Sequence, residues 1–248
     1  MSNNLSLIKT GLLLVVVYFL FAVELKASEV LVLGNESMPF CGLVDGKPAG
    51  LVVDLLEQVT KHGGPKFNYE LGLPWKRAQL MVAQSGHTPT VIVPITRTKS
   101  RENNYLWIQE LLTHEIYIHT YDRPSPLRTI EEARKFPVNV ILGSSIIPTL
   151  KTIGFKRLKE RTNALLMATM LADKAITAVA ESRIVHRYYW SIAGRHLNEI
   201  QLGPKVGNSY TIYIAGNKTF PQDIAEQIKQ AFARALLSGA IEDVRSQW

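Results

Sequence analysis

Strand-like and helix-like segments alternate along this chain from residue 29 onward, and their order restricts the fold more than any other feature. The first alternation runs in the order 30–33, 50–59, 67–71, 75–84 and 91–93, beginning and ending on an apolar strand-like run. A strand–helix–strand order predicts right-handed crossovers, so we expect an α/β fold with mostly parallel sheets covered on both faces. The ligand crevice of such a sheet lies beyond the carboxyl ends of its strands.

A second alternating unit follows the prolines of residues 123–126, which break the pattern. Its expected elements are a helix capped by Thr129, followed by segments at 138–142, 146–153, 163–173, 176–180 and 210–215 and a long amphipathic helix after Pro221. Two short strand-like connections, near 117–121 and 207–211, join the halves. If both cross, the molecule has two lobes on a double hinge, with lobe 1 formed by 28–118 and 212–248 and lobe 2 by 119–211.

The first 27 residues have the layout of a signal peptide, with a short basic segment followed by an apolar run at 12–23. This run is too short for a comfortable membrane span. We expect cleavage after Ala27 and export to the periplasm, with an uncleaved N-terminal anchor as the alternative. The single cysteine, Cys41, lies well beyond the run, so we expect neither a lipoprotein nor an internal disulfide.

The chain is basic, with a formal net charge of +7 and a pI near 9.4. Without the expected leader the 28 basic and 21 acidic residues become 26 and 20, a net charge of +6. Such a charge favours anionic ligands, but the basic residues are scattered and no RNA-binding signature is present, so we expect no nucleic-acid partner. No catalytic or phosphate-binding motif and no metal-ligand spacing is found, so we expect no enzyme activity, cofactor or metal.

A hydroxyl-rich and basic segment, 95–102, directly follows the apolar run at 91–93. It places two guanidiniums, Arg97 and Arg101, on a short turn after a buried strand. Arginine in this position can hold a carboxylate or a phosphate through paired hydrogen bonds. A solvated basic turn is the alternative, and Arg97 suits the cleft rim and solvent equally well.

Several motifs, taken in order, carry a resemblance that covers nearly the whole chain after the leader. They are Gly34 through Pro39-Phe40, Gly50-x3-Asp54-Leu55, Pro74-Trp75-x-Arg77, Thr98-x2-Arg101 followed by Tyr105-Leu106-Trp107, and Val140 through Gly143-Ser144-Ser145. In these residues the chain resembles the family 3 periplasmic solute-binding proteins of the amino-acid-binding type. The resemblance implies the type II fold of two lobes joined by a double hinge.

The resemblance also implies a carboxylate site shared between the lobes. It assigns the ligand carboxylate to Arg101, with the hydroxyl of Thr96 at the preceding strand end. From the other lobe, the backbone N–H groups of Gly143, Ser144 and Ser145 would hold the same carboxylate. Free N–H groups at a helix start suit an anion on independent physical grounds.

Two positions depart from the family pattern for an amino acid. The aspartate that binds the ligand ammonium falls on Ser182, with Glu181 beside it, and the stacking aromatic falls on Ser37, with Glu36 beside it. A buried ammonium without a carboxylate partner would be poorly compensated. Either glutamate substitutes for the aspartate, or the ligand has no amino group.

The implied function is a periplasmic protein that captures a small, carboxylate-bearing, amino-acid-like solute for an ABC-type transporter. Its partners would be that solute and a membrane permease or a sensor, and we expect a monomer. Trp75 and Arg77 are further ligand-binding candidates, which either line the cleft or pack beneath it. The alternatives are an accessory or sensory protein with a degenerate pocket, or a dehydratase-like enzyme with Glu36 or Glu181 as general acid.

Overall fold

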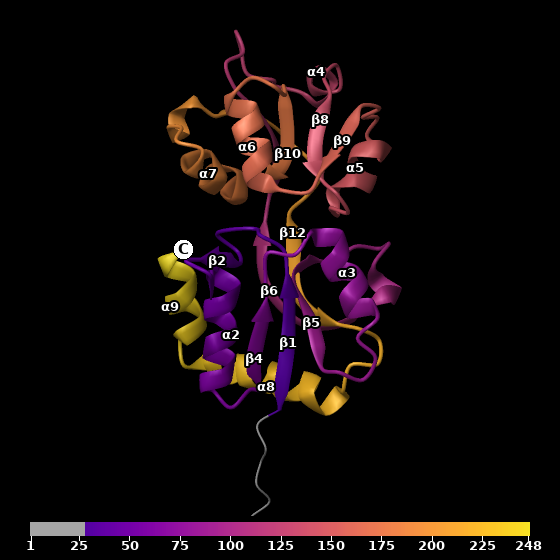
Figure 1. The fold of residues 1–248 in the computed structure, drawn as a ribbon, viewed down its shortest axis with the longest axis vertical. Helices are drawn as coiled ribbons and strands as arrows, with labels where there is room; N and C mark the ends of the chain where they lie inside the picture. The colour runs from indigo at the N-terminus through magenta and orange to yellow at the C-terminus, as the bar shows by residue number, and fades with distance from the viewer. Residues whose placement is uncertain (1–27) are drawn as a thin grey trace, which may run out of the picture.

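The computed structural model describes residues 28–248, and the expected leader lies outside the described residues. The chain forms two lobes, each built on a five-stranded sheet covered by helices, as Figure 1 shows. This arrangement confirms the expected α/β two-lobe architecture. No helix in the described part of the chain is long and apolar enough to cross a membrane.

Lobe 1 has the strand order β4-β1-β5-β12-β6. Its elements are β1 (Glu29–Gly34), β2 (Gly42–Val44), β3 (Lys47–Ala49), α2 (Leu51–Lys61), β4 (Lys66–Glu70), α3 (Trp75–Ala83), β5 (Thr90–Thr96), η1 (Glu102–Asn104), β6 (Leu106–His114), β12 (Tyr210–Gly216), α8 (Gln222–Leu237) and α9 (Ala240–Gln247). Strands β4, β1 and β5 are parallel, whereas β12 runs antiparallel to both β5 and β6. The β2–β3 pair forms a separate hairpin.

Lobe 2 has the strand order β11-β7-β10-β8-β9. Its elements are β7 (Ile116–Thr120), α4 (Ile130–Ala133), β8 (Val138–Ile141), α5 (Ile146–Thr152), β9 (Leu158–Arg161), α6 (Ala164–Ala172), β10 (Ala178–Ser182), α7 (Arg183–Ile192), η2 (Leu197–Glu199) and β11 (Gln201–Lys205). Strands β10, β8 and β9 are parallel, and β7 is antiparallel to its neighbours β10 and β11. Within the two five-stranded sheets, every antiparallel pair therefore involves β7 or β12, which both adjoin a lobe crossing.

Alternation along β1 shows why its sheet is covered on both faces. Val30 and Val32 belong to the apolar cluster that contains α2 and α8, whereas Leu33 belongs to the cluster that contains α3. Successive side chains of a strand point to opposite faces, so an unbroken apolar run requires helices on both sides. In lobe 2, the same alternation places Ala178 and Ala180 in one cluster and Val179 in the other.

The chain passes between the lobes twice (Figure 1). The two passages run side by side, because β6 lies beside β12 in one sheet and β7 beside β11 in the other. The first is at Glu115, between β6 and β7, and the second spans 206–209, between β11 and β12. These points lie a few residues before the boundaries expected at 118/119 and 211/212. After the second passage, α8 and α9 return to lobe 1, where both contact α2.

Gly50 marks the entry to α2 and tolerates no side chain. Its backbone has φ 113° and ψ 164°, a region that is essentially restricted to glycine. A Cβ atom there would lie 2.7 Å from the carbonyl oxygen of Phe40 and 2.9 Å from Cα of Cys41. Gly50 therefore allows the loop after β1 to pack directly against the start of the helix.

Gly50→Ala should lower the free energy of unfolding by about 3 kcal/mol, because backbone strain and a steric clash add together. Gly46→Ala is the matched control: Gly46 also has a positive φ, of 74°, but a Cβ there meets no atom within 4 Å. The control should lose about 1 kcal/mol. Urea denaturation measures both values, and equal losses would contradict the packing argument.

Candidate functional site

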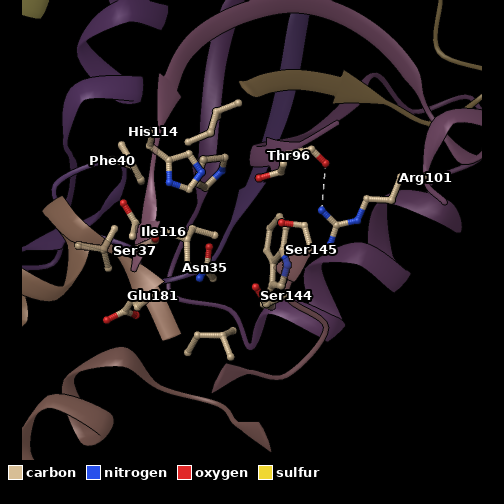
Figure 2. Close-up of a pocket in the computed structure, with 16 residues that line it drawn as sticks. Asn35, Ser37, Phe40, Thr96, Arg101, His114, Ile116, Ser144, Ser145 and Glu181 are labelled. Carbon is tan, nitrogen blue, oxygen red and sulfur yellow. Dashed lines mark hydrogen bonds between the residues drawn. The ribbon is translucent and has the colours of Figure 1, made fainter. Parts of the chain in front are cut away.

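A cavity lies between the lobes, at the carboxyl ends of β1, β5, β8 and β10, as expected for sheets of this kind. Its volume is about 100 Å³. The residues that line it are Asn35, Ser37, Phe40, Trp75, Pro94, Thr96, Arg101, His114 and Ile212 from lobe 1 and Ile116, Ile141, Ser144, Ser145, Glu181, Ser182 and Val185 from lobe 2. Figure 2 shows Arg101 and Glu181 on opposite sides of this space.

Arg101 is a partly buried cation that contacts both lobes. Its guanidinium donates one hydrogen bond to the backbone oxygen of Thr96 at 3.1 Å and another to that of Gly143, in lobe 2, at 2.8 Å. Burial lowers the pKa of Arg101 from its ordinary value, but arginine stays charged in proteins. No carboxylate of residues 28–248 lies within ion-pair distance of this charge. The charge of Arg101 is therefore not paired with an acid within residues 28–248.

Arg97, four residues earlier, is oriented differently. It forms a two-pronged ion pair with Glu102, in which Nε lies 2.9 Å from the carboxylate. Its guanidinium also lies 5.5 Å from the ring centres of Trp107 and Tyr213. Arg97 does not line the cavity, so the structure selects Arg101 from the two arginines of this turn.

The Gly-Ser-Ser turn before α5 faces Arg101 from lobe 2. Gly143 has φ 75°, and its carbonyl oxygen accepts hydrogen bonds from Arg101 and, at 3.3 Å, from Gln79. The N–H group of Ser144 donates to Ile141 at 2.9 Å, so this amide is already engaged within the protein. Ser144 and Ser145 both line the cavity. The turn thus meets lobe 1 through a carbonyl as well as offering polar groups to the cavity.

Glu181 is a buried acid on the opposite wall. One carboxylate oxygen lies 3.3 Å from Nδ1 of His186, whose ring stacks on that of His119 with ring centres 4.1 Å apart. The Nε2–H of His119 donates to the backbone oxygen of Glu181 at 3.2 Å. Burial raises the pKa of the Glu181 carboxyl to about 8 and lowers that of His186 to about 3, so both groups are neutral at pH 7.

Other cavity walls are aromatic or carry a free hydroxyl. Phe40 and Trp75 are both buried and supply the apolar surface. These aromatics come from positions other than Ser37, where the family pattern has its stacking residue. Ser182, at the end of β10, is buried, and its hydroxyl has no hydrogen-bond partner among the described residues.

Three of the residues expected at the site do not line the cavity. The carboxylate of Glu36 instead accepts hydrogen bonds from the N–H of Leu43 at 3.2 Å and from the hydroxyl of Tyr189 at 3.4 Å. Arg77 lies on the exposed side of α3, because helical spacing turns it away from the buried Trp75. Gly143 contributes the carbonyl oxygen held by Arg101, outside the cavity lining.

Besides Ser37, eight residues that line the cavity lie outside the expected set: Asn35, Phe40, Pro94, His114, Ile116, Ile141, Val185 and Ile212. Asn35 and Phe40 flank Ser37 on the loop that follows β1. Because this loop lies at the carboxyl end of a parallel strand, its position in the sequence could have predicted that they line the cavity. His114 and Val185 carry no such signal, because they approach the cavity through β6 and α7, which the sequence pattern did not single out.

The chain has the two-lobe fold of the periplasmic-binding-protein type, with a cavity between the lobes. The sequence matches no family model and no curated protein. Among the described residues, no cluster of three metal-ligating side chains is present.

Solved structures of this fold are similar over nearly the whole of the described chain. A histidine kinase sensor domain with similarity to periplasmic binding proteins aligns with a TM-score of 0.80 and 16% identity, over 89% of this chain and 95% of that one. An ancestral arginine-binding protein bound to arginine gives 0.78 and 17%, covering 89% and 98%. ArtJ of Geobacillus stearothermophilus, which binds arginine, lysine and histidine, gives 0.74 and 17%, covering 89% and 95%. At these identities the similarity establishes the fold.

Glu181 should give the protein a distinctive pH dependence of stability. Because its folded pKa of about 8 lies above the ordinary 4.5, folding holds a proton that unfolding releases. Its contribution is fully present below pH 4.5 and is lost as the pH rises toward 8, at up to about 1.4 kcal/mol per pH unit. Burial lowers the pKa values of His119 and His186 from 6.5, so these histidines change the free energy of unfolding mainly below pH 6.5.

Because the buried histidines are common to both proteins, the difference between wild type and a Glu181 variant from pH 6.5 to 8 isolates the effect of Glu181. Relative to wild type, Glu181→Gln should remove the fall in the free energy of unfolding across this window, as measured by urea denaturation at each pH. Glu160→Gln, at an exposed position of β9, should follow the wild type. Parallel curves for wild type and the Glu181 variant would contradict the assignment.

Proposed function

We propose that this protein is a solute-binding protein that closes its lobes over a small, carboxylate-bearing, amino-acid-like ligand. One observation carries the proposal: Arg101 is a cation that lines the inter-lobe cavity, has no acidic partner in the described chain and is held by carbonyl groups of both lobes. An anionic ligand group at this point would complete a contact that spans the cleft. Its binding would favour the closed arrangement through differential affinity.

The surroundings of Arg101 suit a carboxylate. A guanidinium has five N–H donors, and that of Arg101 forms two hydrogen bonds to residues of 28–248. Thr96, Ser144 and Ser145 line the same part of the cavity and add hydroxyl groups. Charge-assisted hydrogen bonds contribute roughly 1.5 to 3 kcal/mol each, so several of them account for micromolar affinity.

The opposite wall supports a ligand with an amino group. Within the described part of the chain, the Glu181 carboxyl has one hydrogen-bond partner, and the hydroxyl of Ser182 beside it has none. An incoming ammonium would favour the ionised form of the glutamate, so we expect proton release on binding of an amino acid. A keto acid would leave Glu181 protonated. The volume of about 100 Å³ favours ligands of the size of a small amino acid.

Delivery of the solute to an ABC-type permease after export to the periplasm is the role we favour. A substrate-binding protein of an ABC uptake transporter from Streptococcus pneumoniae, with bound histidine, has the same fold at a TM-score of 0.77 and 16% identity. A sensory role is the second candidate, because the histidine kinase sensor domain has the same fold at a TM-score of 0.80. Both roles need the same lobe closure, and neither requires catalysis by this chain.

Substitution of Arg101 tests the proposal directly. Arg101→Met should weaken binding by about 100-fold or more, because it removes a buried partner of the ligand charge. Isothermal titration calorimetry against the twenty amino acids and their keto acids measures the loss. Arg97→Met is the matched control from the same turn and should bind as the wild type does. No binding of any of these compounds by the wild type, or full affinity in the Arg101 variant, would overturn the proposal.

A second prediction concerns lobe closure. The hydroxyl of Tyr189, on α7 of lobe 2, accepts a hydrogen bond from the N–H of Met38 at 3.0 Å and donates to Glu36, both in lobe 1. Tyr189→Phe leaves the Met38 amide without a partner, which destabilises the closed arrangement by about 1 to 2 kcal/mol. We expect about tenfold weaker affinity, mainly through faster dissociation in stopped-flow measurements. Tyr188→Phe is the control, since that hydroxyl has no hydrogen bond to another residue of 28–248, and equal off-rates would contradict the prediction.

A further inference from the structure

His114 is a polar residue in the cavity wall that the carboxylate site does not use. It is the last residue of β6, and its ring lines the cavity on the side away from Arg101, as Figure 2 shows. Both ring nitrogens are buried, and neither has a hydrogen-bond partner among residues 28–248. Buried polar groups in folded proteins are nearly always hydrogen-bonded, so an unpartnered imidazole facing a cavity calls for an explanation.

Packing alone does not account for a histidine at this position. The ring lies edge-on to Phe40, with ring centres 5.4 Å apart, and 5.9 Å from the ring of Tyr210. A phenylalanine would make the same aromatic contacts without two unsatisfied nitrogens. Burial lowers the pKa of His114 to about 4, so the ring is neutral at pH 7 and has one hydrogen-bond donor and one acceptor.

The position of His114 makes it available to a ligand already held by Arg101. The two residues line one cavity, and among the lining residues only Arg101 is charged at pH 7, with Glu181 able to ionise beside a bound ammonium. A charge on the ligand side chain would lie beside the neutral imidazole and its aromatic neighbours, with no opposite charge to offset its loss of hydration. A hydroxyl or an amide would instead satisfy both the ring and itself.

We infer that His114 is a specificity-determining residue, which hydrogen-bonds an uncharged polar group on the side chain of the ligand. This inference rests on the proposed function and narrows its ligand class to amino acids or related acids with a hydroxyl or amide side chain. A site built to hydrogen-bond such a group rejects the apolar analogue strongly, because the buried polar atoms of the protein are then left unpaired.

Pairs of amino acids that exchange a polar group for an apolar one of the same shape test the inference. The probes are serine and 2-aminobutyrate, threonine and valine, homoserine and norvaline, and asparagine and leucine, all as L-enantiomers, titrated calorimetrically. Wild-type protein should prefer the polar member of at least one pair by about tenfold or more. His114→Phe should bring the two members of that pair within about threefold and should still bind the apolar member.

His87→Phe is the matched control, because His87 is exposed and lies outside the cavity, and it should keep the preference. His114→Met serves as a second apolar variant, and circular dichroism melting curves show whether each variant is folded. A preference that survives in either folded His114 variant would overturn the inference, as would equal affinities for both members of every pair in the wild type. In those cases a weakening of binding by about 100-fold or more in Arg101→Met still supports the proposed function, so the two failures are distinguishable.

Discussion

The hydrogen bond from Arg101 to the carbonyl oxygen of Gly143 joins the two lobes at the cleft, and the geometry of the site depends on it. The guanidinium also donates a hydrogen bond to Thr96 in lobe 1, so one side chain is bonded to both lobes. A partly buried cation held by neutral carbonyl groups is only partly compensated. An anion in the cavity would therefore meet a charge that is already oriented, with little reorganisation of the protein.

Contacts on the other side of the cavity complement this one. Tyr189 of lobe 2 meets Met38 and Glu36 of lobe 1, and its ring belongs to the same buried apolar cluster as Phe40. Polar and apolar contacts thus cross the cleft on both sides of the enclosed space. Glu36 does not line the cavity. Its carboxylate accepts the hydrogen bond from Tyr189 and so contributes to the contact between the lobes.

Much of the fold followed from apolar periodicity, because strands covered on both faces, such as β1 and β5, have unbroken apolar runs. The candidate position of Arg101 followed from a local pattern, a turn directly after a buried strand. Glu36 and His114 show the limit of such reasoning. The sequence does not show which of these two polar residues reaches the cavity. In the structure, Glu36 bonds to Tyr189 outside the cavity lining, whereas His114 lines the cavity.

The placement of β12 between β5 and β6 has a consequence for assembly of the chain. Every strand of lobe 2 lies within 116–205, so during synthesis that lobe has all its parts before the chain is complete. The sheet of lobe 1 lacks its fourth strand until residues 210–216 emerge, and α8 arrives later still. The sheet of lobe 1 is therefore the last to be completed, and until then β5 has an unpaired edge and β6 has no partner strand, a state prone to association with other chains.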